Sequence, residues 1–162
     1  MVAVTKESLI RLLNLRPHGA EGGYFSEQYL SGSWRLPDGR SAVDTIYYML
    51  TDDSPVGHFH LNKSVIIHFY HAGSPLRYTT IDPLGKVDSF ILGPDLANGH
   101  ELQHAVEGGD WKATQLMGGT FGLISEVVVP AFSPKDRIIA RRSELAEIFP
   151  DLDVQLLDLA WR

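Results

Sequence analysis

The chain has 162 residues, of which 44% are hydrophobic and 21% are charged, and its formal net charge is −6. This length and composition fit one folded domain and argue against disordered, collagen-like and coiled-coil classes. With 14 Lys and Arg against 20 Asp and Glu, the chain lacks the cationic surplus of a general nucleic-acid binder, so no nucleic-acid partner is expected. No segment has the apolar length of a membrane span or the pattern of a leader peptide. We therefore expect no membrane partner and a cytoplasmic location.

The first predicted element is a short amphipathic helix over residues 5–15, for which Thr5 is a suitable N-cap. From about residue 20 to 140, short runs of β-branched and aromatic residues are separated by Gly, Pro and Asp turn signals. A second helix is predicted over residues 143–149, and the apolar tail 152–161 should pack on this domain or on a second subunit. The predicted strands cover residues 24–30, 44–50, 57–60, 65–71, 77–81, 89–92, 102–106, 111–116, 122–129 and 137–140.

Ten short strands without long helices between them favour an antiparallel sandwich or barrel over alternating βαβ units. We therefore expect a single, mainly β domain over residues 1–162, with short helices near both ends.

Four polar side chains are predicted to meet in one cavity. In the segment Gly57-His58-Phe59-His60, the two-residue period of a strand places His58 and His60 on one face. The same period places His68 and Tyr70 together on the next strand. If both faces turn inward, these four residues are the candidate catalytic groups. The alternative is that they are ordinary core or surface residues without a chemical role.

The segment between Asp53 and Asp82 contains no acidic residue, although the chain as a whole is acidic. It contains Lys63, Arg77 and four histidines, and clustered donors and cations favour an anionic ligand. The alternative is that acids are rare here because buried strands disfavour charge.

Several motifs, taken in order, resemble a known family. They are Glu21-Gly22-Gly23-Tyr24-Phe25, the strand over residues 45–50, His58-Phe59-His60, and His68-Phe69-Tyr70 before Gly73-Ser74-Pro75-Leu76. This combination resembles the cupin superfamily, and more narrowly its DUF985 (Cupin_5) family, over about residues 15–140. The resemblance implies a cupin-type double-stranded jelly-roll β-barrel, commonly paired as a homodimer. It implies no single activity, because such folds host isomerases, oxygenases, storage proteins and binding modules.

Metal-binding cupins place a glutamate shortly after two histidines and add a further histidine on a second motif. His58 and His60 match the first two positions, but residues 64–66 contain no acid. Lys112 stands about where the last histidine would be, and an ammonium group repels a metal cation. The chain also has no cysteine that could act as a ligand. No cofactor is therefore expected; the alternative is a divalent metal on His58 and His60, with His68 or His104 as a substitute ligand.

The resemblance then favours the metal-free sugar-nucleotide epimerases among cupins, in which a histidine base removes a proton next to a carbonyl. We expect a small-molecule-binding protein with isomerase- or epimerase-like chemistry on an anionic or sugar-like metabolite, whose identity the sequence does not specify. His58 or His60 would act as acid or base. The alternatives are a metal-dependent oxygenase- or lyase-like cupin and a non-catalytic metabolite-binding domain. The candidate ligand-binding residues are Glu21, Tyr24, Glu27, Asn62, Lys63, Arg77, Gln103, Trp111 and Lys112.

Overall fold

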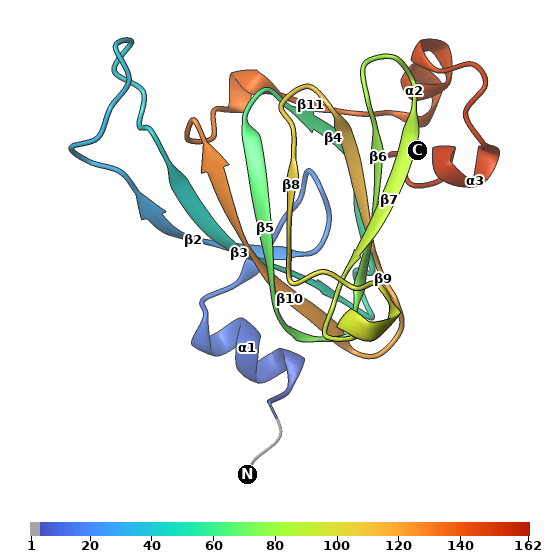
Figure 1. The fold of residues 1–162 in the computed structure, drawn as a ribbon. Coiled ribbons are helices and arrows are strands. Elements are labelled where there is room, and N and C mark those ends of the chain that lie inside the picture. The colour runs from blue at the N-terminus through green and yellow to red at the C-terminus, as the bar shows by residue number, and fades with distance from the viewer. Residues whose placement is uncertain (1–3) are drawn as a thin grey trace.

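The computed structural model describes residues 4–162, so residues 1–3 of the predicted domain lie outside the described residues. Two antiparallel sheets face each other, with strand orders β1-β2-β3-β10-β5-β8 and β11-β4-β9-β6-β7 (Figure 1). Neighbouring strands that are distant in sequence, such as β3 and β10, give this sandwich its jelly-roll connectivity. The strands are β1 (Arg16–Pro17), β2 (Tyr24–Leu30), β3 (Asp44–Thr51), β4 (Val56–Asn62), β5 (Val65–Gly73), β6 (Leu76–Ile81), β7 (Val87–Leu92), β8 (Gln103–Val106), β9 (Trp111–Leu116), β10 (Phe121–Val129) and β11 (Arg137–Ile139).

Every predicted strand has a counterpart in the structure, which confirms the mainly β prediction. The structure extends the predicted strand 57–60 to β4 and the predicted strand 89–92 to β7. It also adds the two-residue strand β1, which pairs with the start of β2. A strand this short carries no alternation pattern that sequence could reveal.

Helix α1 (Lys6–Leu12) begins as predicted, with Thr5 and Ser8 forming a capping box. It ends before the predicted residue 15, because Leu13 is its C-cap and Asn14 adopts a positive φ of 52°. Its apolar face packs against Met49 and Leu123 on the outer side of the first sheet.

The C-terminal segment covers the outer side of the second sheet. Helix α2 (Arg142–Ile148) and helix α3 (Val154–Leu157) follow the last strand and lie at the upper right of Figure 1. Leu145 and Leu159 share a buried cluster with Phe59 and Trp111 of the sheet. The apolar tail therefore packs on its own sandwich, one of the two arrangements expected.

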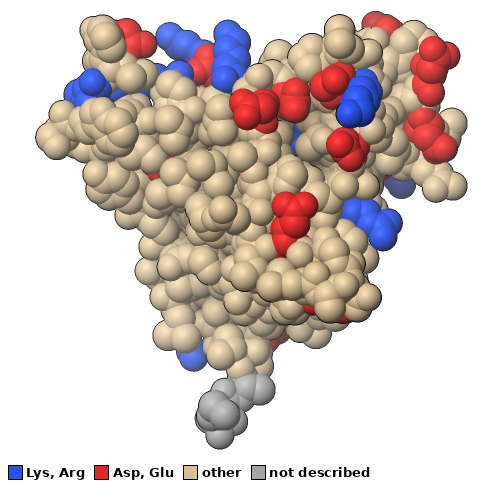
Figure 2. Space-filling view, in the orientation of Figure 1, with Lys and Arg blue, Asp and Glu red and all other residues tan. Residues whose placement is uncertain are grey.

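Two short 3-10 helices, η1 (Leu96–Asn98) and η2 (Pro134–Asp136), complete the fold. On the face drawn in Figure 2, acidic side chains gather at the upper right, over α2 and α3, and much of the remaining surface is uncharged. Within residues 4–162, none of the helices combines the length and the apolar character that crossing a bilayer requires.

Candidate functional site

Strand β4 breaks the two-residue alternation that was predicted for His58 and His60. Gly57 pairs with Thr114 of β9 and His60 pairs with Lys112, so an advance of three residues along β4 matches an advance of two residues along β9. This β-bulge turns His60 into the interior, while Phe59 packs under the C-terminal helices. The prediction that His58 and His60 project together is therefore wrong, and the extra residue of the bulge is the physical reason.

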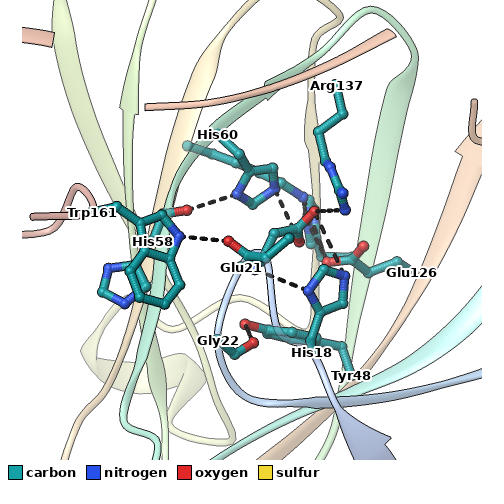
Figure 3. A network of polar contacts seen from close by, with 12 residues as sticks. His18, Glu21, Gly22, Tyr48, His58, His60, Glu126, Arg137 and Trp161 are labelled. Carbon is teal, nitrogen blue, oxygen red and sulfur yellow. Dashed lines mark hydrogen bonds and ion pairs between the residues drawn. The ribbon is translucent and has the colours of Figure 1, made fainter. Parts of the chain in front are cut away.

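His58 instead lies at the rim of the site, beside the C-terminus. Its Nδ1 is 3.1 Å from the Leu159 carbonyl oxygen, and its ring lies 4.1 Å from that of Trp161 (Figure 3). Burial lowers the pKa of His58. The indole N–H of Trp161 donates to the carbonyl of Ala20. The end of the chain is thereby joined to the loop that carries Glu21.

Glu21 lies at the centre of a polar network in the interior (Figure 3). Its Oε2 is 3.4 Å from Nε2 of His60, and its Oε1 is 3.1 Å from Nη1 of Arg137 and 3.8 Å from Nε2 of His18. Gly22 follows it with a φ of +90°, and a Cβ there would lie 2.3 Å from the carbonyl oxygen of Val56. Glycine at this position therefore lets the loop approach β4 closely enough for Glu21 to reach His60.

The hydrogen bonds of His60 determine which of its ring nitrogens carries the proton. Nδ1 lies 2.8 Å from the carbonyl oxygen of His58, which can only accept, so Nδ1 is the donor. Burial lowers the pKa of His60, and the neutral ring then leaves Nε2 without a proton. Burial raises the pKa of Glu21, and His60 and His18 lower it below its ordinary value when their rings are protonated. When His60 is neutral, the ion pair with Arg137 still favours the carboxylate form of Glu21. Two basic atoms therefore face each other with no proton between them.

A second polar cluster lies deeper between the sheets. Lys112 of β9 reaches across the interior, and its Nζ lies 2.7 Å from Nε2 of His68 and 3.5 Å from Oε1 of Glu126. Burial, with the nearby ammonium, lowers the pKa of His68 to about 4. Burial would raise the pKa of Glu126, but Lys112 and His68 outweigh it and hold that pKa well below its ordinary value. The cluster is thus a neutral imidazole with a carboxylate–ammonium pair.

This chemistry does not fit a resident metal ion. His68 and Glu126 would offer a nitrogen and an oxygen ligand, but the Lys112 ammonium already contacts both. His58 and His60, the ligands named in the metal-binding alternative, do not project together from β4. Across residues 4–162, no three His, Asp or Glu side chains are grouped so that they would hold a metal ion.

A cavity of about 340 Å³ opens beside Glu21. About half of its lining is apolar, and the rest is mostly charged. Two residues of its lining, Asp44 and Asn62, each have a buried Oδ1 that finds no hydrogen-bond partner within residues 4–162. The lining residues are His18, Gly19, Ala20, Glu21, Phe25, Glu27, Asp44, Ile46, Asn62, Ile66, Glu126, Val128, Phe132 and Arg137.

Of the candidate residues from the sequence, His60, His68 and Lys112 are buried in the interior, and Glu21, Glu27 and Asn62 line the cavity. Glu27 stands at the exposed edge, where its carboxylate pairs with Arg16 at 3.0 Å.

The other candidates lie elsewhere. The Tyr70 hydroxyl donates to the carbonyl of Gly73, and its ring packs on the apolar end of the interior. The Tyr24 hydroxyl donates to Asp53. Trp111 is buried against the C-terminal helices on the outer side of the sheet. Three further candidates also lie outside the cavity lining: Lys63 and Gln103 are exposed, and Arg77 is an exposed residue of the second sheet.

The structure adds four residues that the sequence-based predictions omit: His18, Asp44, Glu126 and Arg137. Glu126 could have been found from the sequence, because it is the single acid within the largely apolar strand Phe121–Val129. Arg137 had no such signal, since it reaches Glu21 from 116 residues further along the chain. His18 lies only three residues before Glu21, in the segment of residues 17–25, but a loop has no periodicity that would show its side chain turning toward Glu21.

The comparisons with known proteins agree with this fold. A family model described as "Cupin superfamily (DUF985)" matches residues 7–140. The uncharacterized protein YML079W of Saccharomyces cerevisiae is 39% identical over 134 residues, covering 72% of this chain and 66% of the yeast protein. The chain thus matches slightly less than two thirds of that relative's length.

Two solved structures are similar over nearly the whole chain. A hypothetical protein from Leishmania major shares 29% identity with a TM-score of 0.89, covering 98% of this chain and all of the other. Protein SO0799 from Shewanella oneidensis shares 27% identity with a TM-score of 0.91, covering 99% of each chain. With the match over residues 7–140, the family predicted from the sequence motifs is confirmed, and the chain belongs to the DUF985 family of the cupin superfamily.

Proposed function

We propose that this protein binds a small sugar-like metabolite in the cavity and transfers a proton at a carbon next to its carbonyl group, without a metal. The observation that carries this proposal is the Glu21–His60 pair, in which Nε2 faces Oε2 across 3.4 Å. With both groups in their basic forms, this pair takes up one proton readily, because the proton converts a repulsion into a charge-assisted hydrogen bond. That property is what a general base requires.

The proposed step begins with a C–H bond of the substrate at the cavity face of Glu21. The proton moves to the Glu21–His60 pair, and the electrons of the broken bond form the enolate C=C bond while the carbonyl π electrons move to oxygen. Arg137 lines the cavity, and an N–H group of its guanidinium other than the Nη1 group bound to Glu21 would donate to the developing negative oxygen. Return of a proton to the opposite face of the same carbon completes an epimerisation. Return to the former carbonyl carbon, with transfer of the adjacent hydroxyl proton to the enolate oxygen, completes an isomerisation, and neither outcome needs an external oxidant or reductant.

The polar groups of the interior bear on the alternatives raised by the sequence. Metal-dependent chemistry lacks support, because the Lys112 ammonium contacts Nε2 of His68 and Oε1 of Glu126, the two atoms best suited to bind a metal ion. A non-catalytic binding domain would use the same cavity and would differ only in producing no exchange of carbon-bound hydrogen.

Solvent exchange tests the proposal directly. The protein is incubated in D₂O with D-glucose, D-fructose or D-glucosamine, and NMR follows the loss of the hydrogen next to the carbonyl carbon. We expect exchange with wild-type protein and a loss of about 10²-fold in His60→Gln. The matched control is His71→Gln, which changes an exposed histidine bonded to Ser125 and should leave the rate unchanged. No exchange with any sugar, or equal rates in wild type and His60→Gln, would overturn the proposal.

A further inference from the structure

The charged groups of the cavity leave one carboxylate without a cation. Glu21 pairs with Arg137, Glu27 with Arg16, and Glu126 with Lys112. Asp44 also lines the cavity, but residues 4–162 supply it with no ion pair. The cavity therefore carries one negative charge that its own cations do not balance.

Asp44 is also incompletely hydrogen-bonded. Its Oδ2 accepts the backbone N–H of Phe132 at 2.7 Å, whereas its buried Oδ1 has no hydrogen-bond partner in the described part of the chain. Burial, with the nearby Glu126, raises the pKa of Asp44. A buried carboxylate oxygen left unsatisfied is costly, so a ligand that donates to it gains more than it would from an exposed group.

Asn62 provides an independent second observation. It is 8% exposed and lines the same cavity, and its Oδ1 is buried without a hydrogen-bond partner among residues 4–162. Asp44 comes from β3 in one sheet and Asn62 from β4 in the other. Both unsatisfied atoms are acceptors, so a ligand that supplies donors to both residues matches them best.

An anionic ligand is the poorest match to this cavity. It would face four carboxylates, while the Arg137 guanidinium is already bonded to Glu21. This reverses the expectation of an anionic ligand, which was based on the acid-free segment between Asp53 and Asp82. The acids of the site come from outside that segment, on the loop before β2 and on β2, β3 and β10.

We propose that the ligand is a polyhydroxylated amine, of the chemical class of an amino sugar, whose ammonium group binds Asp44 and whose hydroxyl group donates to Asn62. An ammonium offers three donors and the single positive charge that Asp44 lacks. A cavity of about 340 Å³ accommodates a molecule of monosaccharide size. The inference depends on the proposed function only in placing the ligand in this cavity.

Binding of three matched probes tests the inference. Calorimetry with D-glucosamine, D-glucose and D-glucose 6-phosphate should show glucosamine binding about tenfold more tightly than glucose, and the phosphate most weakly. The inference would be overturned if the phosphate bound most tightly, if glucose and glucosamine bound with equal affinity, or if none of the three bound at millimolar concentration. Added salt should weaken glucosamine binding more than glucose binding.

Variants separate this inference from the proposed function. His60→Gln should keep the order of affinities for the three probes while losing solvent exchange. The binding preference can therefore be confirmed even if no exchange is found with the wild-type protein. Asp44→Asn retains an oxygen for the Phe132 N–H but removes the charge, and we expect about tenfold weaker glucosamine binding. Asp158→Asn makes the same change at an exposed surface pair with Arg142 and should have no effect. Unchanged glucosamine affinity in a folded Asp44→Asn protein would overturn the assignment.

Discussion

The ammonium nitrogen of Lys112 on β9 lies 2.7 Å from Nε2 of His68 on β5, across the interior between the two sheets. Oε1 of Glu126 completes this cluster, 3.5 Å from Nζ of Lys112. Lys112 is therefore the cation that balances a buried carboxylate, in addition to linking the two sheets.

Replacing Lys112 by Met should leave the Glu126 carboxylate buried and unpaired. Breaking a buried pair in this way costs about 3–5 kcal/mol of unfolding free energy. Chemical denaturation measures the change, with Lys63→Met as the control. The Lys63 side chain is 69% exposed, so its replacement should change the free energy by less than about 1 kcal/mol. Equal effects of the two changes would contradict the assigned role of Lys112.

The cluster also predicts how the protein responds to a divalent metal. Lys112 contacts both His68 and Glu126, so an added cation would have to displace its ammonium group. We expect untagged protein incubated with Mn²⁺ or Zn²⁺ and then desalted to retain far less than one equivalent per chain by elemental analysis. A stoichiometric metal would instead support the metal-dependent alternative.

The stability of the protein should fall in mild acid. The pKa of His68 drops from 6.5 in the unfolded chain to about 4 in the fold, so the unfolded chain binds more protons between these two values. Stability is therefore fully present above pH 6.5 and is lost as the pH falls toward 4, by about 3 kcal/mol for this group. Chemical denaturation at several pH values between 4 and 6.5 should show that the free energy of unfolding changes less steeply with pH in His68→Gln than in the wild type. An equally steep change in both proteins would contradict the prediction.

The strands could be predicted from sequence because their alternation and turn signals are local. The failure at His58 came from one extra residue between Gly57 and His60, since a bulge depends on pairing with β9 and leaves no local pattern. Glu21 was recognised from its motif, whereas its partner Arg137 lies 116 residues further along the chain. A network assembled from such distant segments becomes visible only when the sheets are paired.

The contact between Trp161 and His58 should hold the loop that carries Glu21. Trp161→Ala removes the contact between the tilted rings and the hydrogen bond to Ala20, and we expect a loss of about 1–2 kcal/mol in stability. Amide hydrogen exchange of residues 18–23 should also accelerate. Trp34→Ala, which removes a side chain of a residue that is 66% exposed, should change neither quantity. Unaltered exchange in Trp161→Ala would show that the loop is held by its other contacts.

The proposed activity depends on His60 presenting an unprotonated Nε2 to the Glu21 carboxylate at neutral pH. Long-range ¹H–¹⁵N NMR of the histidine side chains measures this directly, with the His60 signals assigned by their absence in His60→Gln. We predict a neutral ring whose proton resides on Nδ1, bonded to the carbonyl of His58. A proton on Nε2 at neutral pH, in either a neutral or a doubly protonated ring, would contradict the claim.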